Sequence, residues 1–372
     1  MSPKTQVKVL LLAAGESTRF WPLKEKNTWP FLGKPLLRWH YEQLARLGFP
    51  AVILVGNAQN RDLLLKVAPP ANFKIDFVVQ EGKGQVQAVW AARERLDEGA
   101  VLVLNASDFY DDDFLEQLLR ARRRNPQAIY LGAIRTKNYF PGGYLLPGPN
   151  NSVAAIVEKP SPGKEPSDIV RLVADLFPQG KALVYAVSQT KDSPEAGYEQ
   201  AINHLIVQGS SCLAVLTDVS SWQYLKYPWH TLEVMDGFLQ KIKGQTLGSN
   251  IKIEKNVILE GPLLIEDNVK IMEYTKIVGP CYIGRDTIVG NHSLIRQSHL
   301  GQGCVTGFAT EITRSFIGSN CWFHRNYIGD SVLEADVGMG SGAVLANFRL
   351  DEREIPSQVA GIKIKTGRFK LG

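Results

Sequence analysis

The sequence predicts an α/β protein with two differently built parts, and two observations indicate this division. Through about residue 240, short apolar runs alternate with helix-like stretches, which is typical of a mostly parallel sheet with helices on both faces. After residue 250, aliphatic residues recur at every sixth position, a period that specifies a parallel β-helix of hexapeptide repeats. We therefore expect a first domain over 1–240, a polar connector over 241–250, a β-helix over 251–346 and a tail over 347–372.

The sheet is predicted from apolar runs that begin near the N-terminus. The first run is Val9-Leu10-Leu11, and later runs cover 52–55, 75–79 and 101–104. Helix-like stretches cover 59–67 and 84–96, and a further helix, acidic at its start and basic at its end, is expected over 111–124. Ligands of such sheets bind at the carboxyl ends of the strands, so the loops that follow strands are where a site is expected.

The β-helix is predicted from a row of aliphatic residues in constant register. The row consists of Ile253, Leu259, Ile265, Ile271, Ile277, Ile283, Val289 and Ile295. After Ile295 the spacing drops to five at Leu300, and it is five again between Ile312 and Ile317. Such steps resemble those inside left-handed β-helix acyltransferases, which implies a left-handed β-helix. The tail is interpreted either as an end of its own or as a truncated continuation of the β-helix, because an uncapped β-helix would expose an edge.

Composition excludes several classes of protein. The 372 residues are 44% hydrophobic and 21% charged, with a net charge of +5. This mild positive charge suits small anionic substrates and does not indicate nucleic acid. No apolar run approaches a membrane span or a signal peptide, and the four cysteines form no metal or disulfide pattern. We therefore expect a cytoplasmic, reduced protein that contacts neither membranes nor nucleic acids.

The turn after the first strand is the strongest candidate for a binding site. It reads Leu12-Ala13-Ala14-Gly15, and Arg19 follows four positions after the glycine. Small residues let backbone N–H groups approach a ligand, and a guanidinium binds phosphate. The turn is neither a Walker loop nor a dinucleotide-binding turn. It predicts a triphosphate site; the alternative is a tight exit from a core strand.

The surrounding motifs carry a family resemblance. Leu12-Ala13-Ala14-Gly15 with Thr18-Arg19, then Lys26, then Gly33-Lys34-Pro35, resembles the signature of sugar-1-phosphate nucleotidyltransferases. The spacing from Arg19 to Lys26 is most similar to the uridylyltransferase half of the bifunctional enzyme that makes UDP-N-acetylglucosamine. The resemblance implies a Rossmann-like, GT-A-like first domain. One residue departs from it, because Glu25 stands where the family has proline.

The resemblance implies a role for each matching residue. It assigns catalysis to Arg19 and Lys26, nucleotide binding to Leu12, Ala13, Ala14, Gly15, Gln80 and Gly84, sugar-phosphate binding to Gly143, Glu158 and Lys159, and Mg²⁺ to Asp108. The implied reaction couples a sugar 1-phosphate to a nucleoside triphosphate. It needs no catalytic base, because the attacking sugar phosphate is already ionised at neutral pH. The alternative for Asp108 is an ordinary cap of the helix that begins near residue 111.

Two further departures concern metal and sugar binding. Tyr224 stands where the family has its second metal-binding aspartate, and Lys226 stands where it has glycine. Val173 replaces a glycine near the expected sugar site. A tyrosine binds Mg²⁺ poorly at neutral pH because its pKa is about 10. We hypothesise that the Lys226 ammonium replaces part of the second metal contact.

The second half resembles the acetyltransferase part of the same bifunctional family. His324, Tyr327 and the following Gly329-Asp330 match its histidine motif, Asn347 matches its acetyl-CoA asparagine, and Arg296 stands where an arginine would bind the sugar phosphate. A neutral histidine is the usual base for amine acetylation. Thr313 replaces a family lysine, and the coil before His324 is one residue short. A purely structural histidine is therefore the alternative.

These observations predict an enzyme that couples UTP or dTTP to a glucose- or N-acetylglucosamine-type sugar 1-phosphate, with Mg²⁺, and releases pyrophosphate. One alternative is a bifunctional enzyme that also acetylates glucosamine 1-phosphate from acetyl-CoA. The other is a catalytically weak regulatory or scaffold subunit that binds nucleotide sugars. Small molecules are the expected ligands, and a homo-oligomer, with a trimer favoured, is the expected assembly.

Overall fold

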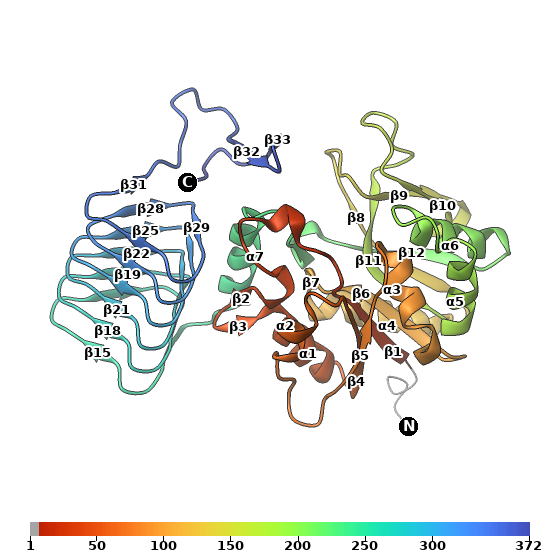
Figure 1. The fold of residues 1–372 in the computed structure, drawn as a ribbon, viewed down its shortest axis with the longest axis horizontal. Coiled ribbons are helices and arrows are strands. Elements are labelled where there is room, and N and C mark those ends of the chain that lie inside the picture. Colours follow the sequence, from red (N-terminus) through yellow and green to blue (C-terminus); the bar gives the residue numbers. More distant parts are fainter. Residues whose placement is uncertain (1–6) are drawn as a thin grey trace. The chain divides into compact units, whose positions relative to one another are not determined.

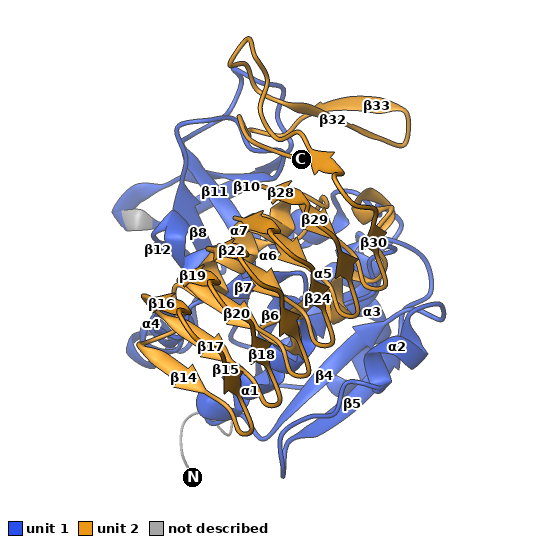
Figure 2. Cartoon of the chain, turned by 90° about the vertical axis from the view of Figure 1, so that its left-hand side faces the viewer, with its two compact units in different colours: residues 1–16, 36–223 blue, residues 17–35, 224–372 orange. Residues whose placement is uncertain are grey.

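The computed structural model describes residues 7–372 (Figure 1). The chain divides into two compact units, coloured blue and orange in Figure 2. The first unit comprises residues 1–16 and 36–223, and the second comprises 17–35 and 224–372. A short segment of the N-terminal half therefore belongs to the same unit as the hexapeptide repeats.

The first unit is built on a nine-stranded mixed sheet. Its centre is β1 (Val7–Leu12), which pairs in parallel with β4 (Ala51–Gly56) and β6 (Ala100–Asn105), and β4 pairs in parallel with β5 (Lys74–Val79). These four strands confirm the apolar runs predicted from the sequence. β11 (Ile169–Phe177) pairs antiparallel with β6 and with β8, so the sheet is not parallel throughout. The other strands of this sheet are β8 (Ile129–Arg135), β9 (Gly143–Pro147), β10 (Val153–Glu158) and β12 (Cys212–Thr217), and two short strands lie outside it, β7 (Asp108–Tyr110) and β13 (Trp222–Tyr224).

Helices cover the sheet because its strands are apolar on both faces. Leu10 and Leu12 belong to a buried core shared with α3 (Gln85–Ala91), α5 (Gly180–Ser188) and α6 (Gly197–Val207). Neighbouring residues of a strand face opposite sides, so Leu11, which is buried between these two, faces the other side of the sheet. The remaining helices of the unit are α1 (Leu36–Arg46), α2 (Arg61–Leu65) and α4 (Asp112–Arg124). The helix expected over 84–96 ends early at Ala91, and a 3₁₀ turn follows over Arg93–Arg95.

The second unit contains a left-handed parallel β-helix made of three six-stranded parallel sheets (Figure 2). The aliphatic row is fully buried from Ile265 to Ile295, as predicted, whereas Ile253 in the first coil is 43% exposed. The coils become shorter along the chain. Register partners in neighbouring coils show this, since Phe316 and Val332 are closer in sequence than Leu263 and Cys281. This shortening agrees with the five-residue steps noted in the sequence.

The strands of the three sheets are short, and each sheet collects one strand from every coil. The first sheet is β14 (Gln245–Leu247), β17 (Leu263–Ile265), β20 (Cys281–Ile283), β23 (His299–Leu300), β26 (Phe316–Ile317) and β29 (Val332–Leu333). The second is β15 (Lys252–Ile253), β18 (Lys270–Ile271), β21 (Ile288–Val289), β24 (Val305–Thr306), β27 (Trp322–Phe323) and β30 (Gly338–Met339). The third is β16 (Ile258–Glu260), β19 (Lys276–Val278), β22 (Leu294–Arg296), β25 (Glu311–Thr313), β28 (Tyr327–Gly329) and β31 (Val344–Leu345).

The start of the β-helix differs from the sequence-based expectation, whereas its last strand, β31, ends inside the expected range 251–346. β14 lies inside the expected connector 241–250, because its backbone pairs with β17 and so already belongs to the first coil. The tail does not continue the β-helix. It forms an antiparallel hairpin of β32 (Pro356–Val359) and β33 (Ile362–Lys365), joined by Ala360 and Gly361 at positive φ. Two central residues with positive φ make the tight turn that favours a hairpin.

Two further findings concern the whole described chain. No helix in residues 7–372 is long and apolar enough to cross a membrane. All four cysteines are free and buried, and three of them, Cys281, Cys304 and Cys321, fill the core of the β-helix.

Candidate functional site

The loop that follows β1 is held by its carbonyl groups. The carbonyl oxygens of Ala13 and Ala14 accept hydrogen bonds from Asn60 Nδ2 and Asn57 Nδ2, each at 2.8 Å. The backbone N–H groups of Ala14 and Gly15 donate to no residue among those that the structure describes. Unpaired N–H groups on a loop after a strand form an anion-binding concavity, so the geometry supports the predicted phosphate loop.

Sequence reasoning missed Asn57 and Asn60, whose side chains bind the carbonyl groups of this loop. Each side-chain oxygen accepts from the other residue's backbone N–H, at 2.9 and 2.8 Å, so the pair is a closed unit before α2. Asn60 is 4% exposed. The signal was present, because two asparagines three positions apart directly follow an apolar run, where side chains of this type commonly bond to nearby backbone.

Gln80 and Gly84 shape the next loop. Gln80 is 8% exposed, and its Nε2 donates to the carbonyl oxygens of Gly82 and Gly84, both at 3.1 Å. Its Oε1 accepts from no described residue, so this oxygen can accept from a nucleobase N–H. Gly84 has φ 88°, and a Cβ there would lie 1.9 Å from the carbonyl oxygen of Pro194. The glycine is therefore required by a close backbone approach.

Asp108 lies in β7 and is 7% exposed. Asn105 Nδ2 donates to Oδ1 at 3.1 Å, and the Tyr110 hydroxyl lies 3.2 Å from Oδ2. Burial and the nearby carboxylate raise the pKa of Tyr110 well above its ordinary value, so it remains a protonated donor. The helix-cap alternative for Asp108 is wrong, because Asp111 occupies the N-cap of α4.

The carboxylate of Asp108 fits a magnesium ion that arrives with a nucleotide. Among residues 7–372, no group of three or more His, Cys, Asp or Glu side chains could hold a metal by itself. Mg²⁺ is usually held by one or two carboxylates together with substrate phosphates. The donor set at Asp108 therefore suits a shared site and not a dedicated protein cage.

The predicted sugar-phosphate residues lie together. Gly143 in β9 pairs with Glu158 in β10, and a Cβ on Gly143 would lie 3.1 Å from Glu158 Oε2. Lys159 has φ 44°, donates its backbone N–H to Gly142 O at 3.1 Å, and places Nζ 3.4 Å from Glu158 Oε1. Burial, followed by the charge of Glu199, raises the pKa of Glu158. The structure thus brings all three residues to one polar patch.

A buried charge cluster beside this patch was missed. The Arg171 guanidinium lies 2.6 Å from Asp175 Oδ2 and also contacts Glu199, and the Tyr198 hydroxyl donates to Asp175 at 3.0 Å. A Cβ on Gly143 would lie 3.7 Å from Arg171 Nε, which donates to no described residue. Charged residues inside an otherwise apolar strand were the available signal.

Burial sets the titration of this cluster. It raises the pKa of Asp175 to about 6, against the opposing attraction of Arg171. Burial also disfavours the charge of Arg171, but Asp175, Glu199 and Tyr198 together outweigh it and raise the pKa of this guanidinium. Arg171 therefore stays charged.

Val173 replaces the family's glycine in the same strand, β11. Its carbonyl oxygen accepts a hydrogen bond from the Tyr110 hydroxyl at 2.9 Å. The same hydroxyl lies 3.2 Å from Asp108 Oδ2. The Tyr110 hydroxyl therefore lies between Val173, which stands where the family has glycine, and Asp108, the predicted metal ligand.

Arg19 and Lys26 belong to the second unit. Arg19 lies in the 3₁₀ turn η2 (Thr18–Phe20) and is exposed, and Lys26 begins η3 (Lys26–Thr28). The Glu25 side chain caps η3, because its Oε1 accepts from Asn27 N at 3.0 Å. At the position where the family has proline, this chain therefore has a glutamate that forms a hydrogen-bonded turn.

The segment around Tyr224 contacts a buried histidine. The rings of Tyr224 and His230 are 4.5 Å apart, and Lys226 donates its backbone N–H to His230 Nδ1 at 3.3 Å. Lys226 Nζ lies 5.7 Å from the centre of the Tyr227 ring. Burial, Lys226 and Arg368 lower the pKa of His230 to about 3, so its ring is neutral.

Comparison with protein families identifies the first part of the chain. The family described as "Nucleotidyl transferase" matches residues 8–223. The chain belongs to the nucleotidyl transferase family. In the same comparison, six bacterial transferase hexapeptide repeats match residues 262–297. This nucleotidyl transferase is therefore an enzyme that also carries hexapeptide repeats.

Relatives match both parts together. A bifunctional sugar-1-phosphate nucleotidylyltransferase/acetyltransferase of Sulfurisphaera tokodaii is 27% identical over 98% of this chain and 89% of its own. The bifunctional protein GlmU of Methanococcus vannielii is 26% identical over 96% and 85%. A crystal structure of apo-UDP-glucose pyrophosphorylase has a TM-score of 0.56 at 16% identity and covers 63% of this chain and 99% of that chain, which shows a shared fold.

The β-helix of this nucleotidyl transferase brings together some of its predicted residues. Asn347 Nδ2 donates to Asp330 Oδ2 at 2.6 Å and lies 3.2 Å from the Tyr327 hydroxyl. Arg314 holds both oxygens of Asp330, at 2.8 and 2.7 Å. Tyr327, Asp330 and Asn347 thus form one hydrogen-bonded group at the end of the β-helix.

His324 and Arg296 are not hydrogen-bonded into that group. His324 is exposed and packs edge-on against Trp322 at 4.3 Å, and its ring makes no hydrogen bond to a described residue. Arg296 forms an ion pair with Glu311 at 2.6 Å. Glu311 and Tyr327 are register partners in neighbouring coils. The number of residues between them is the length of one coil, and it is small, in agreement with the short coil noted before His324.

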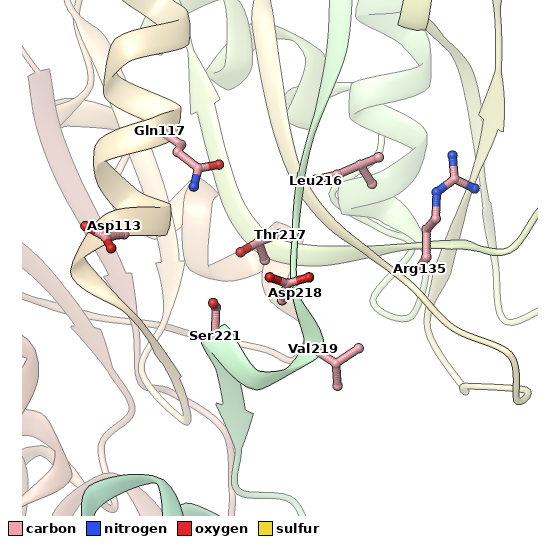
Figure 3. Close-up of a pocket in the computed structure, with 8 residues that line it drawn as sticks. All are labelled: Asp113, Gln117, Arg135, Leu216, Thr217, Asp218, Val219 and Ser221. Carbon is pink, nitrogen blue, oxygen red and sulfur yellow. The ribbon is translucent and has the colours of Figure 1, made fainter. Parts of the chain in front are cut away.

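The nucleotidyl transferase unit also contains an open polar pocket of about 490 Å³ (Figure 3). It is lined by Asp113, Gln117, Arg135, Leu216, Thr217, Asp218, Val219 and Ser221. None of these is a predicted site residue, so no sequence motif pointed to a pocket here.

Proposed function

We propose that this nucleotidyl transferase joins UTP or dTTP to a sugar 1-phosphate of the glucose or N-acetylglucosamine type and releases pyrophosphate. The observation that carries the proposal is the loop after β1, whose carbonyls are fixed by Asn57 and Asn60 while the N–H groups of Ala14 and Gly15 are unpaired among the described residues. The relative of Sulfurisphaera tokodaii, named for sugar-1-phosphate nucleotidyl transfer, supports the substrate class.

The reaction forms one phosphorus–oxygen bond and breaks another. A sugar-phosphate oxygen attacks the α-phosphorus of the triphosphate, and the β-phosphate oxygen leaves with pyrophosphate. Catalysis consists of alignment and charge neutralisation, because the nucleophile is already ionised. Arg19 and Lys26 neutralise phosphate charge, the N–H groups of Ala14 and Gly15 bind phosphate oxygens, and Gln80 Oε1 accepts from the base.

Substrate selection follows from the polar patch of the first unit. Lys159 binds the sugar phosphate, and Glu158, beside Gly143, accepts from sugar hydroxyls. Asp108 would hold Mg²⁺, which supplies positive charge to the phosphates. The Lys226 hypothesis predicts activity that depends only weakly on Mg²⁺, and complete loss in chelator with an ordinary millimolar requirement would overturn that hypothesis.

The direct test is pyrophosphate release from the full chain over a panel of nucleoside triphosphates and sugar 1-phosphates, with and without Mg²⁺. We expect turnover with UTP or dTTP and a gluco-configured sugar 1-phosphate. Silence across the panel, together with measurable nucleotide-sugar binding, would favour the regulatory or scaffold alternative.

We also propose acetyl transfer from acetyl-CoA to glucosamine 1-phosphate as a second function. The observation in its favour is the group of Tyr327, Asp330 and Asn347, together with the bifunctional names of the relatives. His324 would act as the base, and Arg296 would bind the sugar phosphate. Thiol release from acetyl-CoA tests this: no release in the wild type, or an unaltered rate in His324→Ala, would contradict it.

A trimer is proposed for the assembly. On the β-helix, Tyr274 stacks on His292 with ring centroids 4.9 Å apart, and Phe308 packs edge-on against His292 at 5.3 Å; Tyr274 and Phe308 are exposed. Exposed aromatic rows of this kind favour self-association. Sedimentation equilibrium gives the mass directly, and a monomer at micromolar concentration would contradict the proposal.

A further inference from the structure

We propose that the β-helix positions the segment that carries Arg19 and Lys26, with Phe316 as the central positioning residue. The segment is residues 17–35, which belongs to the same compact unit as the β-helix. The inference rests on the proposed function, because it assigns the β-helix a part in nucleotidyl transfer. It predicts that Phe316, which is far from Arg19 and Lys26 in sequence, affects the rate of nucleotidyl transfer.

The first observation is an aromatic cluster between the segment and the β-helix. The ring of Trp29 lies 5.2 Å from that of Phe316, and the ring of Phe31 lies 5.9 Å from it. Phe31 also stacks on Phe238 of α7 (His230–Leu239) at 5.1 Å. All four side chains are at most 5% exposed. Fully buried rings hold one another in a narrow range of geometries.

The second observation is the hairpin turn at the end of the segment. β2 (Pro30–Phe31) and β3 (Lys34–Pro35) are joined by Leu32 and Gly33, both at positive φ. A Cβ on Gly33 would lie 2.4 Å from the hydroxyl oxygen of Tyr282 in β20. The glycine of the Gly-Lys-Pro motif therefore lies directly against the β-helix.

The third observation is that the contact surface is itself a stack. Tyr282, His299 and Phe316 are register partners in β20, β23 and β26, and neighbouring rings are 4.6 and 4.5 Å apart. Each ring is at most 1% exposed. Phe316 is thus fixed from the β-helix side by the two coils before it.

The anchored rings are adjacent in the chain to both cations. Phe20, next to Arg19, packs edge-on against Trp29 at 5.4 Å. Trp29 donates its backbone N–H to the carbonyl oxygen of Lys26 at 3.2 Å. A shift of Trp29 would therefore displace both Arg19 and Lys26. Displacing a charge-neutralising group by about 1 Å can cost about 10²-fold in rate.

The test compares two alanine variants of the full chain. Phe316→Ala removes the anchor. Phe323→Ala is the matched control, because Phe323 is equally buried in the β-helix core and makes no ring contact with the segment among the described residues. For Phe316→Ala we expect faster amide exchange confined to peptides of 17–35 and a kcat lower by about 10- to 100-fold. KM for the triphosphate should change less than about 3-fold, because the nucleotide-binding loops of the first unit are unaltered.

Phe323→Ala should lower thermal stability without either effect, and Phe316→Leu should recover part of kcat. Equal behaviour of the two alanine variants, or unaltered exchange in 17–35, would overturn the inference. If an alanine variant does not fold, Phe316→Leu against Phe323→Leu gives the same comparison. Absence of turnover in the wild type would contradict the proposed function instead, and amide exchange alone would then decide the positioning role.

Discussion

The Glu25 carboxylate accepts two hydrogen bonds from Asn27, from its backbone N–H at 3.0 Å and from its Nδ2 at 2.7 Å. Ser17 Oγ lies 3.4 Å from the same oxygen, so one carboxylate joins the two ends of the loop before Lys26. Glu25 has φ −73°, close to the value that a proline ring would impose. Hydrogen bonds therefore hold this loop at the position where the family has a proline.

Glu25→Ala should therefore lower kcat about 5-fold, in line with the roughly 1 kcal/mol that a lost cap costs. Glu25→Pro should recover most of this loss, because the backbone is already in a proline-compatible conformation. Steady-state pyrophosphate release measures both variants. A proline variant no more active than the alanine variant would contradict the interpretation.

Asn60→Ala should raise KM for the nucleoside triphosphate about 5- to 10-fold, the equivalent of one lost hydrogen bond of about 1 kcal/mol. The reason is that Ala13 loses its side-chain donor, so the phosphate loop is less ordered before binding. Asn326→Ala is the control, because its buried amide likewise donates to backbone carbonyls, those of Gly340 and Ala343, but lies in the β-helix. Equal KM values for the two variants would contradict this role.

Asp108→Asn should reduce nucleotidyl transfer by about 10²-fold or more at a Mg²⁺ concentration that just saturates the wild type, because a neutral amide holds Mg²⁺ poorly. Asp111→Asn, at a helix N-cap without a side-chain capping bond, should stay within about 2-fold. A Mg²⁺ titration of both variants by pyrophosphate release makes the comparison. The assignment fails if the Asp108 variant retains wild-type activity and metal dependence.

Arg171→Met should lower the free energy of unfolding by about 3–5 kcal/mol, because it leaves two buried carboxylates without their partner. Arg135→Met removes an exposed pair with Asp168 and should cost about 1 kcal/mol or less. Chemical denaturation measures both. A double variant Arg171→Met/Asp175→Asn should recover part of the loss, and no recovery would argue against a charge-based cause.

Stability should fall in mild acid because of buried neutral histidines. Burial lowers the pKa of His299 to about 4, whereas the unfolded chain takes up its proton near the ordinary value of 6.5. The unfolded state therefore binds the proton first, and the free energy of unfolding decreases as pH falls from 6.5 to 4, by up to about 1.4 kcal/mol per pH unit for each such group.

His299→Phe should make this pH dependence shallower by one proton. The ring stack is retained, and the carbonyl of Ile317 keeps its backbone hydrogen bond from Gly301 at 2.9 Å. Denaturation curves at several pH values give the slope. An unchanged slope would show that His299 does not titrate between the two states.

Much of the candidate site could be predicted from residue order. Gly143, Glu158 and Lys159 were predicted from short motifs, and the structure places them together because β9 and β10 pair directly. Arg171 could not be assigned in this way, because its partner Glu199 lies on a different element, α6. Side-chain pairing of this kind depends on how two elements pack, which no local pattern encodes.

The sequence by itself determined the two architectures and the order of the candidate residues along them. Periodicity is a local property, so Ile265 to Ile295 specify a β-helix wherever it stands in the chain. Only the tertiary structure decided that residues 17–35 belong with that β-helix, that Asn57 and Asn60 hold the loop after β1, and that the tail turns into a hairpin. The reason is physical: burial of Trp29 against Phe316 requires shape complementarity between residues far apart in sequence, and that complementarity exists only once both elements have folded.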